Sequence, residues 1–168
     1  MFHKVVEKNY QDVIDVEMVK RHLRISHNED DNLLTEILKS SIDYAEVFLR
    51  KSICRQVIEF QFCNERFNNV VKLPVVYSDK VISCNIESSG VSSALKEKID
   101  FIFDDQTIKI FSRLGKIVFT YQASWPDVCV PPNIVQGLLQ HVEALYDKES
   151  GKLHQALKNY SMHKKMLI

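Results

Sequence analysis

Cysteines, histidines and clustered carboxylates are the side chains of this sequence that could carry chemistry. The four cysteines are Cys54, Cys63, Cys84 and Cys129, and no two of them form a CxxC pair. Protein zinc sites combine Cys and His at short, regular spacings, and none of the six histidines stands at such a spacing from a cysteine. We therefore expect buried free thiols in a reducing cytoplasm and no metal ion.

Catalytic and phosphate-binding motifs are missing from the sequence. It has four glycines and no GxSxG, GxGxxG or GK[ST] segment, so neither a strained nucleophile turn nor a phosphate loop is expected. Acidic residues cluster at 29–31 and at 104–105. We interpret the first cluster as favourable charge at a helix N-terminus and the second as a turn. The sequence predicts no catalytic, cofactor-binding or metal residues, and hence a protein that is not an enzyme.

Chain length and net charge restrict the class of protein further. The 168 residues suit one domain, or one domain with an insertion. The chain has 22 Lys plus Arg residues and 22 Asp plus Glu residues, so its net charge is zero. It therefore lacks the surplus cations of a nonspecific nucleic-acid binder.

No signal sequence opens the chain, and no apolar run reaches the roughly 18 residues that cross a bilayer. We expect a protein that is cytoplasmic when synthesised and has no membrane partner.

Helical spacing dominates the N-terminal part, at about residues 13–53. Asp15 is a good N-cap for a short helix, because its carboxylate can accept bonds from free backbone amides. Ser26 and Glu29 have the spacing of a capping box for a second helix that reaches about Lys51. Apolar residues recur along this second helix at intervals of three and four.

Alternating patterns replace helical ones at about residues 54–122. Short runs rich in Val, Ile and Phe predict antiparallel strands near 58–62, 70–73, 80–86, 100–103, 107–111 and 116–121. Because helices precede and follow this block, we expect an α+β fold: a small helical bundle, made of two N-terminal helices and one C-terminal helix, with an inserted antiparallel β block.

The C-terminal helix is expected at residues 131–150. Pro132 suits a first helical turn, where no amide hydrogen is needed, and Gly151 is the expected stop. Residues 152–168 mix apolar side chains with lysines and histidines. We expect them to form a half-ordered docking tail.

A DNA-binding or DNA-packaging accessory protein is the alternative interpretation. Two helices within residues 15–50, with Lys20, Arg21 and Arg24 on the first, loosely follow a helix-turn-helix. The connecting segment is acidic and the second helix carries as many acids as bases. Phosphate repulsion argues against this interpretation.

Several segments together resemble the tailed-phage head-tail connector family, also called adaptor, head-completion or possible DNA-packaging proteins. They cover nearly the whole chain: HLRI at 22–25, the acidic linker 28–31, YAEVF at 44–48, VKLPVV at 71–76, IVFTYQA at 117–123, VPPNIVQGLLQHVEALYDKES at 130–150 and LKNY at 157–160. None of them is a catalytic signature. Relatives also serve in gene transfer agents and degenerate prophages.

The resemblance implies a structural subunit of the particle neck. Family members form a ring, dodecameric in the particle, although isolated subunits can be monomeric. The ring docks beneath the portal protein and is followed by a stopper or tail-completion protein, while DNA passes through its channel without specific binding. No cofactor is implied.

Two sets of residues are candidates for these contacts. Portal docking is predicted for apolar tail residues, which would be buried on the partner: Leu153, Leu157, Tyr160 and Met166. Lateral contacts between ring subunits are predicted for the polar face of the long helix: Glu36, Lys39, Asp43, Glu46 and Arg50.

Overall fold

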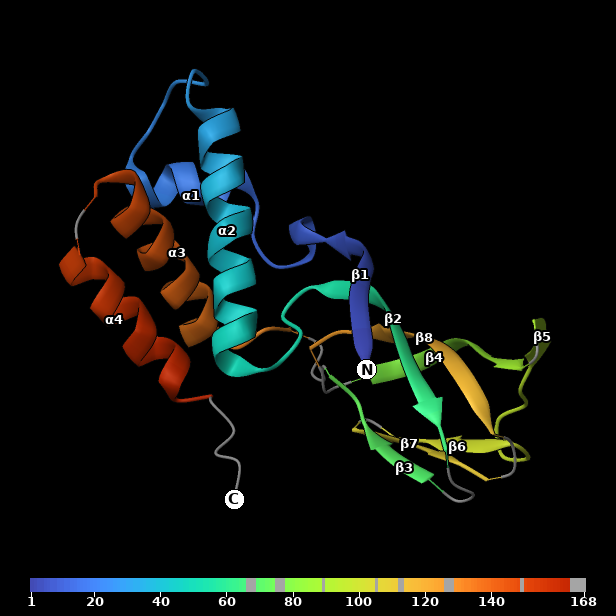
Figure 1. The fold of residues 1–168 in the computed structure, drawn as a ribbon. Helices are drawn as coiled ribbons and strands as arrows, with labels where there is room; N and C mark the ends of the chain where they lie inside the picture. The colour runs from blue at the N-terminus through green and yellow to red at the C-terminus, as the bar shows by residue number, and fades with distance from the viewer. Residues whose placement is uncertain are drawn as a thin grey trace. The chain divides into compact units, whose positions relative to one another are not determined.

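A computed structural model describes residues 1–65, 69–74, 78–88, 90–104, 106–111, 114–125, 129–148 and 150–163 (Figure 1). The chain divides into two compact units. The β unit comprises Met1–Lys8 and Arg55–Pro126, and the helical unit comprises Asn9–Cys54 and Asp127–Ile168. This confirms the predicted α+β class and the strand block inserted between helices.

The helical unit contains four α-helices and a short 3₁₀ turn among its described residues: η1 (Tyr10–Asp12), α1 (Val16–Leu23), α2 (Asp31–Leu49), α3 (Pro132–Tyr146) and α4 (Ser150–Ser161). Helix α3 packs against both α2 and α4 (Figure 1). Apolar side chains at helical spacing fill the core between them, including Leu34, Leu38, Ile42, Ala45, Leu49, Ile134, Leu138 and Val142. Burial of these stripes drives the bundle together.

The start of α1 is as predicted, and that of α2 is not. The Asp15 carboxylate accepts a hydrogen bond from the Met18 amide at 2.7 Å. The capping box predicted for Ser26 and Glu29 is wrong: α2 begins at Asp31 and has no side-chain cap bond. Asp31 is instead engaged by Lys20 of α1, whose ammonium lies 2.9 Å from its Oδ1.

The half-ordered tail predicted after residue 150 is also wrong for the described residues, which form α4. Helix α3 ends at Tyr146 and Gly151 lies inside α4, so Gly151 is not the stop. Ala156 and Tyr160, four residues apart on α4, are fully buried. Gly137 of α3 allows this packing, because a Cβ there would lie 2.6 Å from Cε1 of Tyr160.

The β unit has two antiparallel sheets. The strands are β1 (Phe2–Asn9), β2 (Arg55–Asn64), β3 (Asn69–Lys72), β4 (Ser78–Ser88), β5 (Val91–Ala94), β6 (Phe101–Phe103), β7 (Thr107–Ile110) and β8 (Gly115–Ala123). Their orders are β1-β2-β8-β4-β5 and β3-β7-β6. The six predicted runs correspond to β2, β3, β4, β6, β7 and β8, whereas β1 and β5 were not predicted.

The core of the β unit lies between the two sheets. Inward residues of β2, β4 and β8 alternate with outward ones and join residues of β3, β6 and β7 in one buried cluster. Phe101 meets Phe119 edge to face with ring centroids 6.1 Å apart, and Phe103 lies 5.5 Å from the same ring. Such aromatic pairs stabilise by more than the area they bury.

Candidate subunit-interaction surfaces

The predicted docking residues differ in how far they are exposed. Leu153 and Leu157 are half-buried neighbours four residues apart on α4. Tyr160 is 0% exposed, and its hydroxyl lies 3.4 Å from Nδ1 of His141. Tyr160 therefore holds α4 against α3 and offers no surface in this conformation, while Met166 lies outside the described residues. The structure does not test the docking role itself.

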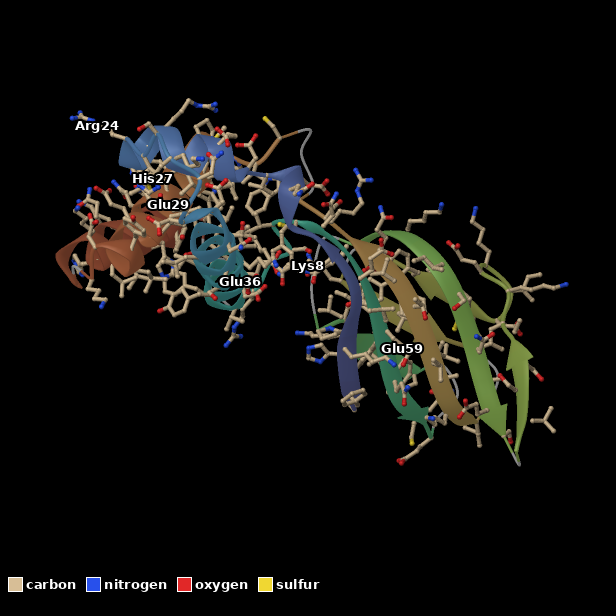
Figure 2. All side chains as sticks on the ribbon, turned by 90° about the horizontal axis from the view of Figure 1, so that it is seen from above. Lys8, Arg24, His27, Glu29, Glu36 and Glu59 are labelled. Atoms are coloured by element: carbon tan, nitrogen blue, oxygen red, sulfur yellow. The ribbon has the colours of Figure 1, made fainter. Side chains whose placement is uncertain are left out.

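Three residues of the predicted lateral face lie on the outer side of α2. Glu36 and Lys39 form an ion pair at 2.8 Å, one turn apart, and Figure 2 shows Glu36 at the surface of the helix. The Tyr10 hydroxyl donates to Asp43 at 3.2 Å. Exposed pairs of this kind contribute little to folding stability.

The other two residues of that face have roles at the end of α2. The Glu46 carboxylate accepts hydrogen bonds from the amides of Ile53 and Cys54, at 2.7 and 3.0 Å. It thereby fixes the chain where it leaves the helical unit. Arg50 ends the helix in the left-handed conformation, with φ of 55°. Glu46 thus has an internal structural role that its position in the sequence did not reveal.

A second apolar stripe on α2 was missed by the sequence analysis. Leu33 and Val47 are 52% and 79% exposed and lie, with Ile37, along one side of the helix. Tyr44 lies on the same side and is 46% exposed, but its ring meets His141 of α3 edge to face, with centroids 5.1 Å apart. This stripe is separate from the buried stripe that begins at Leu34. The signal was present in the sequence as a second helical periodicity, one residue out of phase with the first. A helix with two apolar sides has surface for a further partner.

Polar contacts fasten the helices to one another. Glu143 of α3 contacts Nε2 of His22 at 3.1 Å and Nζ of Lys152 at 2.9 Å. The bond from Lys152, followed by that from His22, lowers the pKa of the Glu143 carboxyl. The Tyr146 hydroxyl donates to Asp30 at 2.7 Å. Helices α1, α2, α3 and α4 are thus joined by polar contacts beside their apolar core.

The cations suggested for DNA binding are not presented together. Lys20 is 4% exposed, its ammonium binds Asp31 and Asn28, and its pKa is raised mainly by the hydrogen bond to Asp31. A buried, paired lysine cannot reach a phosphate. Arg21 and Arg24 stay exposed, and Figure 2 shows Arg24 at the outside of the helical unit.

Clusters that could bind a metal ion are not found within the described ranges: no three His, Cys, Asp or Glu side chains are suitably grouped there. None of the helices described is long and apolar enough to span a membrane. The surfaces that distinguish this chain are the outer side of α2, the half-buried leucines of α4 and the strands at the sheet margins.

Comparison with protein families gives a match over part of the chain. The model of the phage gp6-like head-tail connector protein family matches residues 13–88. The resemblance noted in the sequence is confirmed over these residues, which are similar to the head-tail connector family. No curated protein matches the chain.

Solved structures match the fold over the full length. A chain titled as the neck of an empty gene transfer agent (GTA) particle, computed with C6 symmetry, has a TM-score of 0.79 and 13% identity, covering 100% of this chain and 98% of that chain. The neck of a native GTA particle computed with C12 symmetry and the virion of a native GTA particle both give 0.76, with the same identity and coverage.

Proposed function

We propose that this chain is a structural subunit of a head-tail connector ring in a phage or gene-transfer-agent particle. The ring is dodecameric, docks beneath the portal protein and leads to the stopper or tail-completion protein. DNA passes through its channel without specific binding, and the chain performs no reaction. After synthesis in the cytoplasm, the protein ends in the particle neck.

The observation that supports this proposal best is the agreement over the full chain with subunits of GTA necks. Both the helices and the inserted strands take part in it, since 100% of the chain is covered. A match confined to the four helices would be weaker support, because helical bundles are common among unrelated proteins. The family match at residues 13–88 adds support that does not depend on the fold.

Portal docking is assigned in this proposal to the outward side of α4 and the residues after it. Leu153 and Leu157 keep part of their side chains at the surface, and Met162 is 72% exposed. Burial of such exposed apolar side chains by a partner is energetically favourable. Tyr160 acts indirectly, by holding α4 in place, and Met166 extends the same apolar segment.

Lateral ring contacts are assigned to the outer side of α2. Glu36, Lys39, Asp43 and Arg50 alternate in sign along this face, so it can pair with charges of either sign on a neighbouring copy. The neighbouring stripe of Leu33 and Val47 supplies apolar area. A closed ring needs contacts of this head-to-tail kind, in which each copy uses two different surfaces.

Co-purification with the cognate portal tests the docking assignment. The double variant Leu153→Ser and Leu157→Ser should lose at least tenfold in portal binding and keep the helical circular dichroism of the wild type. The matched control is Val70→Ser with Ile99→Ser, which alters similarly apolar but exposed residues of the β unit (56% and 69%). Unchanged portal binding by the α4 variant would refute docking through α4.

A further inference from the structure

The two edge strands of the five-stranded sheet, here called its margins, are β1 and β5. In the order β1-β2-β8-β4-β5 each of them has one hydrogen-bonded neighbour, and they stand at opposite ends of the sheet (Figure 1). A margin strand presents a row of backbone N–H and C=O groups that another extended chain can pair with. Natural proteins protect such margins or use them for binding.

Strand β1 exposes three large apolar side chains. Phe2, Val5 and Val6 are 58%, 48% and 57% exposed. Lys4 lies 3.2 Å from Glu59, a β2 residue between the inward-facing Ile58 and Phe60, so Lys4 lies on the outer face of the sheet. Because successive side chains alternate, Val6 shares that outer face and Val5 lies on the inner one. Apolar side chains on both faces suit a strand with a further strand beside it.

Strand β5 is a short margin of four residues, which itself limits pairing, but it carries no protective side chains. Its sequence, Val91–Ala94, contains no charged residue and no proline, although these are the residues that commonly prevent margin pairing. Val91 is 65% exposed. The pairing with β4 continues beyond the strand, since the Leu95 amide donates to the Cys84 carbonyl at 2.8 Å. The margin is therefore ordered and extended.

We propose that β1 of one copy pairs with β5 of the next copy, so that the five-stranded sheets join edge to edge around the ring. This inference rests on the proposed ring function and adds a second lateral contact, in the β unit. A second copy is the fitting occupant because one chain provides both complementary margins. Two different margins that meet head to tail generate a ring, whereas two identical margins would give a closed pair. The zero net charge of the chain opposes neither a ring nor a closed pair of copies.

Disulfide trapping tests this arrangement in rings assembled at high protein concentration or with the portal. The background replaces the exposed thiols by Cys63→Ser and Cys129→Ser. One partner carries Val5→Cys and the other a cysteine on the same inner face of β5. The first choice is Ser93→Cys, whose strand partner Ile86 is buried in the core, and the second is Val91→Cys, because the register between copies is open. Mixed rings should form β1–β5 cross-linked dimers, and neither variant should do so alone. Ile82→Cys, half exposed on the interior strand β4, is the matched control and should not cross-link to β5.

The outcomes separate this inference from the proposed function. Rings that form but show no cross-link at either β5 position would overturn the strand pairing and leave the connector ring standing. Self-linking of the Val5→Cys variant would also overturn it, because it would reveal symmetric β1–β1 contacts. If no ring forms at high concentration or with the portal, the proposed function and the strand pairing both fail.

Discussion

Replacing Gly137 by alanine is the sharpest test of how α4 is held in the bundle. Alanine is ordinarily the better helix former, by about 1 kcal/mol. At this position its Cβ would lie 2.6 Å from Cε1 and 3.0 Å from Cδ1 of Tyr160, and 3.2 Å from Cβ of Asn159. The first distance is about 0.8 Å short of the 3.4 Å at which ordinary contact begins.

The tyrosine ring has little freedom to yield. It is 0% exposed, and Phe48 and His141 lie 6.2 Å from it, centroid to centroid. Overpacking of a buried site typically costs 1–3 kcal/mol, which exceeds the gain in helix propensity. We expect Gly137→Ala to lower the free energy of unfolding by about 1–2 kcal/mol, measured by urea denaturation followed by circular dichroism.

Gly151→Ala provides the matched control. Gly151 is also helical, but a Cβ there would meet nothing within 4 Å, so this change should be neutral or stabilise by up to about 1 kcal/mol. Combining Gly137→Ala with Tyr160→Leu should cost less than the sum of the two single changes, because leucine lacks the clashing ring edge. If Gly137→Ala stabilised the protein as much as Gly151→Ala, the close packing of α3 on α4 would be refuted.

Three further predictions concern buried groups. Lys20→Met should lower the thermal midpoint clearly more than Lys39→Met, because only the first removes a buried cation; equal midpoints would contradict this. Burial lowers the pKa of His141 below 6.5, so its protonation favours the unfolded chain. Stability should fall as pH drops through about 6.5, by at most about 1.4 kcal/mol per pH unit, and His141→Gln should flatten that dependence. Burial, then the charge of a nearby aspartate, raises the pKa of Cys84 to about 12; in thiol titration near neutral pH Cys84 should react far more slowly than the exposed Cys63, and similar rates would argue against this packing.

The main helices and the interior strands were predictable because one periodicity decides each of them. Leu34, Leu38 and Leu49 recur at helical spacing and are buried, while Ile58, Phe60 and Phe62 alternate and are buried as a strand. In these elements local pattern and tertiary burial agree, so the sequence alone was sufficient.

The elements that were missed depend on contacts distant in sequence. Strand β1 contains Lys4, Glu7 and Lys8 among its apolar residues, and its place beside β2 follows from pairing across more than forty residues. Helix α4 has weak local signals and is held by Tyr160 against Gly137. Such burial on α3 is not visible in a local window.

The candidate interaction residues were predictable in part. Side chains were assigned to surfaces by periodicity, which placed Glu36 and Asp43 correctly on the outside. Periodicity could not foresee that Glu46 binds backbone amides at the end of α2 or that Tyr160 faces inward. Internal hydrogen bonding and burial decide these roles, and both depend on the folded arrangement.

Electron microscopy of the purified protein mixed with its cognate portal tests the central claim most directly. A connector subunit should appear as a second ring stacked on the portal, with rotational symmetry matching a dodecamer. A portal that remains bare at saturating protein concentration, with the protein still monomeric beside it, would contradict the assignment.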